Sequence, residues 1–172
     1  MAWGNNDSGQ TNVPAGIASV AAIAGGGFHS LVVTALLPTC NGKLATIVGT
    51  AGDSTVSGTP GPDVIVDLTG NNKIRAAGGN DTICTGPGND GINGGGGNDW
   101  VDAGDGTNSA EGNAGHDTII TGSGKDELEG NGGNDTLTGG TGADKFRGGD
   151  GTDIATDFTP AEGDTKTSVE VF

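Results

Sequence analysis

Residues 94–102 read GGGGNDWVD, and residues 130–138 read GNGGNDTLT. Both stretches have glycine at the fourth place, aspartate at the sixth and an apolar residue at the eighth. This nine-residue pattern runs without insertion or deletion from Gly49 to Thr156, which makes twelve units. A fixed short period predicts one small structural unit stacked many times. The fourth-place glycines are Gly52, Gly61, Gly70, Gly79, Gly88, Gly97, Gly106, Gly115, Gly124, Gly133, Gly142 and Gly151.

The composition argues against an ordinary globular core. Of 172 residues, 37 are glycine and only 31% are hydrophobic. Glycine loses much backbone entropy on folding, so something besides apolar burial has to stabilise the fold. The net charge of −15 indicates bound cations, because they would relieve the repulsion among the acids. The same charge argues against a nucleic-acid partner, which would require clustered Lys and Arg.

Each unit combines a glycine turn with a short strand. Glycines allow positive φ and leave backbone carbonyls accessible, and calcium takes six to eight oxygens from carboxylates and carbonyls alike. We therefore predict that the turn supplies carbonyls, that the sixth-place aspartate supplies the charge, and that folding and calcium binding are linked. The strand points its eighth-place side chain inward. The predicted core is Val56, Ile65, Ile74, Ile83, Ile92, Val101, Ala110, Ile119, Leu128, Leu137, Phe146 and Ala155.

The twelve units in phase resemble the glycine-rich nonapeptide of the RTX, or haemolysin-type, calcium-binding β-roll. The resemblance covers most of the chain. It implies an all-β, right-handed parallel β-roll with two nonapeptides per turn and several Ca²⁺ ions between turns stacked on the same side. It also implies carbonyl ligands at places one and three of one turn, and at places two and four of the next. In the best units, the first- and third-place residues are Gly94, Gly96, Gly112, Ala114, Gly130 and Gly132.

Alternate units separate a complete row of sixth-place acids from an interrupted one. The complete row is Asp63, Asp81, Asp99, Asp117, Asp135 and Asp153. The interrupted row is Ser54, Asn72, Asp90, Asn108, Asp126 and Asp144. Because neutral ligands weaken calcium affinity, we expect ions along the whole first row. In the second row we expect a firm site between Asp126 and Asp144 and weaker or empty sites before it. Ligation through the side-chain oxygens of Asn72 and Asn108 remains the alternative.

The outward faces beside the two rows also differ. Places seven and nine next to the complete row are mainly apolar residues and threonine, whereas those next to the interrupted row are charged or polar. A contiguous apolar face usually meets a partner. We hypothesise that segment 15–37 covers this face and that Cys40 reaches Cys84. The alternative is that β-forming residues simply populate the strands.

The two cysteines, Cys40 and Cys84, fit no metal-thiolate spacing. A disulfide between them would stabilise the fold by up to about 4 kcal/mol in the loop-entropy model. Two free thiols in a reducing compartment are the alternative. The disulfide is favoured because a protein that binds millimolar calcium would be extracellular.

We divide the chain into segments 1–37, 38–48, 49–156 and 157–172. In the first, residues 3–35 resemble one repeat of a chromosome-condensation-regulator type β-propeller, although a propeller requires several blades. The uncharged stretch 15–37 is long enough to span a membrane, but its glycines and serines and the absence of preceding basic residues argue against a span or signal peptide. Segment 38–48 is expected to lead into the roll, with Lys43–Val48 as its first strand. Segment 157–172 is expected to cap the roll through Phe158, Val169, Val171 and Phe172.

The sequence therefore predicts a secreted, non-enzymatic calcium-binding β-roll. A structural or adhesive protein that assembles with copies of itself in the presence of calcium is the alternative. No catalytic constellation is evident: His29 lies in the propeller-like motif, and His116 occupies the variable fifth place. Neither a phosphate-binding loop nor an EF-hand loop is present.

Overall fold

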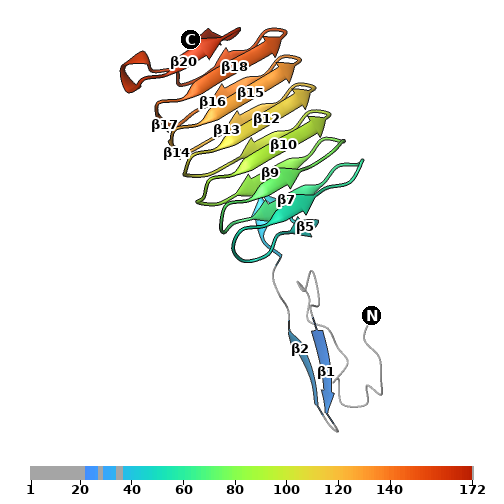
Figure 1. Ribbon diagram of the computed structural model, residues 1–172. Coiled ribbons are helices and arrows are strands. Elements are labelled where there is room, and N and C mark those ends of the chain that lie inside the picture. Colours follow the sequence, from blue (N-terminus) through green and yellow to red (C-terminus); the bar gives the residue numbers. More distant parts are fainter. Residues whose placement is uncertain (1–21, 27–28, 34–36, 172) are drawn as a thin grey trace. The chain divides into compact units, whose positions relative to one another are not determined.

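The computed structural model describes residues 22–26, 29–33 and 37–171 (Figure 1). The chain divides into two compact units, Met1–Leu37 and Pro38–Phe172. In the first unit, β1 (Ala22–Gly26) and β2 (His29–Val33) form an antiparallel pair. The hypothesised cover by segment 15–37 and the propeller-like repeat depend on residues outside the described ones and stay predictions. None of the described helices has the length and apolar character needed to cross a membrane.

The second unit is a parallel β-roll built from two sheets (Figure 1). The seven-stranded sheet contains β6 (Thr55–Ser57), β8 (Lys73–Arg75), β10 (Gly91–Gly96), β12 (Ser109–Ala114), β15 (Glu127–Gly132), β18 (Lys145–Asp150) and β20 (Thr165–Thr167). The eight-stranded sheet contains β5 (Ile47–Val48), β7 (Val64–Asp67), β9 (Thr82–Thr85), β11 (Trp100–Asp102), β13 (Thr118–Ile120), β16 (Thr136–Thr138), β19 (Ile154–Ala155) and β21 (Glu170–Val171). The predicted all-β parallel roll is confirmed.

The register of the sheets shows why two nonapeptides make one turn. Val101 lies opposite Ile119 in one sheet, and Ala110 lies opposite Leu128 in the other, a separation of eighteen residues in both cases. Eighth-place side chains therefore stack on one another inside the roll. All twelve predicted core residues are buried. Ala76 and Ala103, from first places, join the same core and were not predicted.

The segment before the roll differs from the single strand expected over Lys43–Val48. Instead, β4 (Lys43–Leu44) pairs antiparallel with β3 (Thr39–Cys40), and only β5 joins the parallel sheet. The reason is the Asn41–Gly42 dipeptide, where both residues have positive φ, 47° and 73°. Such a dipeptide favours a tight hairpin turn, which pairs Lys43–Leu44 with β3, and the strand then breaks at Ala45 and Thr46 before β5 begins.

The hairpin packs on the eight-stranded sheet, with Cys40 bonded to Cys84 of β9 and a Cα–Cα distance of 5.7 Å. Cys40, Ala45 and Val66 form a second, small buried cluster, against which Trp100 packs. The N-terminal part of the apolar face is thus covered by segment 39–45 of the roll's own unit.

The C-terminal segment closes the other end of the core. It comprises the 3₁₀ helix η1 (Pro160–Glu162), followed by β20 and β21. Phe158 packs edge-to-face on Phe146 at 6.1 Å between ring centroids, and Val169 is buried in the core. Val171 is 42% exposed, so its predicted capping role is wrong. This is consistent with its position at the end of β21, the edge strand that pairs only with β19. Phe172 lies outside the described residues.

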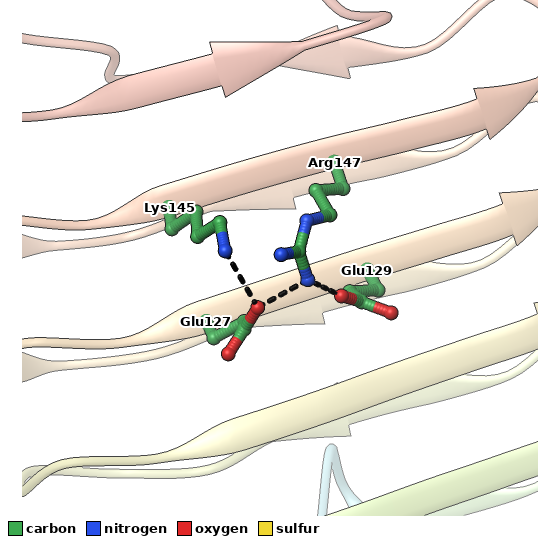
Figure 2. Close-up of polar contacts among 4 residues, drawn as sticks. All are labelled: Glu127, Glu129, Lys145 and Arg147. Carbon is green, nitrogen blue, oxygen red and sulfur yellow. Dashed lines mark hydrogen bonds and ion pairs between the residues drawn. The ribbon is translucent and has the colours of Figure 1, made fainter.

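The outer face of the seven-stranded sheet carries an ion-pair cluster between neighbouring strands (Figure 2). Lys145 Nζ lies 3.2 Å from Glu127 Oε1, and Arg147 contacts both Glu127 and Glu129. These side chains are partly exposed, and exposed pairs contribute about 1 kcal/mol or less. The cluster therefore makes this a solvated face and adds little to the stability of the fold.

Candidate metal centre

The turns between the two sheets stack in two columns. Column A is the set of turns that lead from the seven-stranded to the eight-stranded sheet, residues 58–63, 76–81, 94–99, 112–117, 130–135 and 148–153. Column B is the set that leads back, residues 49–54, 67–72, 85–90, 103–108, 121–126 and 139–144. The complete row of aspartates lies in column A and the interrupted row in column B.

The sixth-place carboxylates are held by a repeated backbone contact. All nine aspartates of the two rows are buried, with at most 6% of each residue exposed. In eight of them, all except Asp63, one oxygen accepts a hydrogen bond from the sixth-place N–H one turn earlier. Asp81 N donates to Asp99 Oδ1 at 2.9 Å, Asp99 N donates to Asp117 Oδ1 at 2.8 Å, and Asp117 N donates to Asp135 Oδ1 at 2.8 Å. The eighteen-residue register therefore aligns the carboxylates.

The second carboxylate oxygen is the unusual feature of these turns. Within the described residues, seven of these Oδ2 atoms are buried and have no hydrogen-bond partner, those of Asp81, Asp90, Asp99, Asp117, Asp126, Asp135 and Asp153. An unpaired buried carboxylate oxygen is strongly unfavourable, because it has lost its water and gained no donor. A bound cation would satisfy these atoms.

The first-place glycines have no Cβ, and this leaves room for the Oδ2 atoms beside the backbone. A Cβ built on Gly94, Gly112 or Gly130 would lie 2.4, 2.2 or 2.2 Å from the Oδ2 atom of the aspartate in its own turn. The third-place carbonyls lie between turns, where Gly96 O accepts the Gly79 N–H at 2.7 Å and Gly132 O accepts the Gly115 N–H at 2.8 Å. Ala114 O accepts the Gly97 N–H in the same way. Each of these carbonyls keeps a second lone pair.

The donor set fits a hard cation with oxygen ligands. The described residues contain no group of three or more His, Cys, Asp or Glu side chains placed to hold one metal ion. The available ligands are one carboxylate from each turn and the backbone carbonyls around it. Structural zinc sites are closed tetrahedral sets of Cys and His, whereas calcium accepts carboxylate and carbonyl oxygens in variable number. The turns thus suit calcium.

Burial also changes the protonation of the carboxylates. It raises the pKa of Asp99 to about 7 and that of Asp117 and Asp144 to about 6, with a smaller contribution from neighbouring acids. The pKa values of Asp81, Asp90, Asp126 and Asp135 are raised for the same first reason. Desolvation penalises the charged form, so the calcium-free turns favour protons.

Column B contains two amides where column A has carboxylates. Asn72 Oδ1 accepts the Ser54 N–H at 3.1 Å, and Asn108 Oδ1 accepts the Asp90 N–H at 2.9 Å. Their Nδ2 atoms donate to Asp67 O and Gly104 O, each at 3.0 Å. The oxygen and the nitrogen of each amide therefore both have a hydrogen-bond partner within the protein.

Several contributing side chains were missed by sequence reasoning. Asp67, at a first place in column B, is buried and contacts the Ser54 hydroxyl through its carboxylate. Thr85 and Thr121 occupy first places of the same column and are also buried. The sequence could have revealed them through the residue at the first place of each unit, which is glycine in most of column A but not in most of column B. At the exposed fifth place, His116 Nδ1 accepts the Asn134 N–H at 2.7 Å, so this histidine has a structural contact.

Comparison with known proteins places these turns in a family. HemolysinCabind, the RTX calcium-binding nonapeptide repeat, matches in four copies, at residues 57–92, 85–119, 93–128 and 120–155. Together the copies cover more than half of the chain. Searches of curated proteins and of solved structures found no match. Both the repeat matches and the parallel roll agree with the resemblance drawn from the nonapeptides, and the chain belongs to the RTX calcium-binding nonapeptide repeat family.

Proposed function

We propose that the roll is an extracellular, non-enzymatic calcium-binding module that folds on binding several Ca²⁺ ions along column A. The observation that carries this proposal is the run of five successive column A aspartates, Asp81 to Asp153, whose buried Oδ2 atoms have no partner among the described residues. Five such atoms in one column require a compensating charge. Calcium would supply it and would pull successive turns together.

The residues that would hold each ion come from neighbouring turns. Between the turns that end at Asp99 and Asp117, the two carboxylates and the glycine-turn carbonyls form the ligand set. Gly94 and Gly112 leave room beside the carboxylates. In column B, Asp126 and Asp144 are the pair of sixth-place acids in consecutive turns, and we place one firm site there.

The extracellular assignment rests on two features. Calcium at millimolar concentration is found outside cells, and disulfides such as Cys40–Cys84 persist in oxidising compartments. The non-enzymatic assignment rests on the use of the buried carboxylates as ligands, which leaves them unsuited to proton transfer.

Titration with calcium tests the proposal. We expect far-ultraviolet circular dichroism of the calcium-stripped protein to gain β-structure as calcium is added, and calorimetry to report several ions per chain. Magnesium should be much less effective, because it prefers a rigid octahedral site and keeps its water. No gain of β-structure and no heat up to about 10 mM calcium, a concentration that saturates even weak extracellular sites, would overturn the proposal.

Calcium-dependent self-assembly is the second candidate function, and the exposed edge strand at one end of the roll favours it. All three residues of β20 are exposed, and this strand forms the open edge of its sheet. Open edges can pair with strands of another copy. Light scattering with and without calcium tests this candidate, and a protein that stays monomeric when loaded with calcium contradicts it.

A further inference from the structure

We infer that Asn72 and Asn108 replace bound cations in column B, and that these two residues decide which turns take calcium. This inference rests on the proposed function, because it assigns the occupied and unoccupied turns of the same roll. It concerns residues that lie in the interrupted row and that are 3% and 2% exposed.

The geometry of the amides carries the inference. At Asn108, Oδ1 accepts the Asp90 N–H, the same contact that the sixth-place aspartates from Asp81 onward make through their Oδ1. Because Oδ1 is fixed in this way, Nδ2 must occupy the position where the aspartates have the unpartnered Oδ2. That amide donates to Gly104 O at 3.0 Å, within its own turn. An N–H donor thus meets the turn carbonyl that a cation would otherwise meet.

Asn72 repeats the arrangement two turns earlier. Its Oδ1 accepts the Ser54 N–H, and its Nδ2 donates to Asp67 O at 3.0 Å. Calcium requires oxygen ligands facing it, and at both positions the atom that faces the carbonyls is a nitrogen with hydrogens. Each side chain therefore excludes the ion while satisfying a carbonyl of its own turn.

Threonine hydroxyls add hydrogen bonds between successive turns of column B. Thr85 Oγ1 donates to Ala103 O at 3.0 Å, and Thr121 Oγ1 donates to Gly139 O at 2.8 Å, so each joins its own turn to the next one. The equivalent first places in column A carry no polar side chain, since they are Gly58, Ala76, Gly94, Gly112, Gly130 and Gly148. Successive turns of column B thus share hydrogen bonds through first-place hydroxyls that column A lacks.

Exchanging amide and carboxylate tests this assignment. We expect Asn108→Asp to create an unbroken run of acids from Asp90 to Asp144 and to raise the calorimetric calcium number by about two, one for each new pair of adjacent carboxylates. Asn89→Asp is the matched control. It adds the same charge at an exposed fifth place of column B, where the side-chain oxygen accepts the Thr107 N–H, and should leave the calcium number unchanged.

The reverse exchange, Asp117→Asn, should lower the calcium number by about two and make the calcium-free protein more resistant to urea, because an amide donor would replace an unpartnered oxygen. This variant keeps the inference testable if Asn108→Asp does not fold. Calcium numbers equal to wild type in either Asn108→Asp or Asp117→Asn would overturn the inference while leaving the proposed function intact. Absence of calcium binding by every variant and by wild type would instead overturn the proposed function.

Discussion

Replacing Gly130 by alanine tests whether the carboxylates face the first-place backbone. The added Cβ would lie 2.2 Å from Asp135 Oδ2 and 2.7 Å from Asp135 Cγ, so the carboxyl group must retreat until these atoms are about 3.4 Å apart or more. That movement breaks the 2.8 Å hydrogen bond from Asp117 N to Asp135 Oδ1. Overpacking costs about 1–3 kcal/mol, and the lost hydrogen bond costs about 1 kcal/mol. We expect a total destabilisation of about 2–4 kcal/mol.

Gly132→Ala is the matched control for Gly130→Ala, because both glycines lie in the same turn and neither has a left-handed φ. The nearest atom to a Cβ on Gly132 is Asn113 O, at an ordinary 3.4 Å. Both changes remove similar unfolded-chain entropy, so the difference between the variants reports the carboxylate contact alone.

Urea denaturation of the calcium-loaded variants measures that difference, and calorimetry measures the calcium number. We expect Gly130→Ala to lose the ions that contact Asp135 and Gly132→Ala to keep them. Equal stability and equal calcium number in the two variants would refute the reasoning that places the free oxygen against the first-place glycine.

Three further expectations follow from the same structure. Because burial raises the pKa of Asp99 to about 7 and of Asp117 to about 6, the calcium-free fold binds more protons than the unfolded chain. Its stability should therefore fall as the pH rises from the ordinary carboxyl value of 3.8 through these values. Circular dichroism in chelator should show more β-structure at about pH 5 than at about pH 8, and the calcium midpoint should rise on acidification. Reduction of Cys40–Cys84 should lower the free energy of unfolding by up to about 4 kcal/mol, measured in urea with and without reductant; no change would mean that the hairpin does not constrain the chain. Leu128→Ala should cost about 2–5 kcal/mol and should increase hydrogen exchange mainly in the neighbouring turns, since repeat units contact only their neighbours; uniform loss of protection along the roll would contradict this.

The nonapeptide period was enough to predict the sheets, the core and the alignment of the carboxylates. Each depends on a side chain at a fixed place of a repeat, such as Leu128 in the core or Asp99 in a turn. The register then follows, because a parallel roll with two units per turn can align these places only at a separation of eighteen residues.

Features outside the period could not be predicted in the same way. The hairpin at Asn41–Gly42 depends on a local turn preference that the expected Lys43–Val48 strand overlooked. The roles of Thr85 and Thr121 depend on the direction of each hydroxyl group, and the nonapeptide pattern does not specify that direction. The amide contacts of Asn72 and Asn108 likewise required the positions of carbonyls within the folded turns.

The constant register fixes the steps by which such a chain can change its length during evolution. Gain or loss of eighteen residues adds or removes one complete turn and leaves every other pairing in place, as the opposition of Val101 and Ile119 shows. Gain or loss of nine residues would instead transfer every downstream turn to the opposite column. If the change fell between the units of Asn72 and Asn108, Asn108 would interrupt the row of aspartates and Asp117 would join the column that contains Asn72. Natural length variants of this roll should therefore differ by whole turns and preserve the separation of acid and amide.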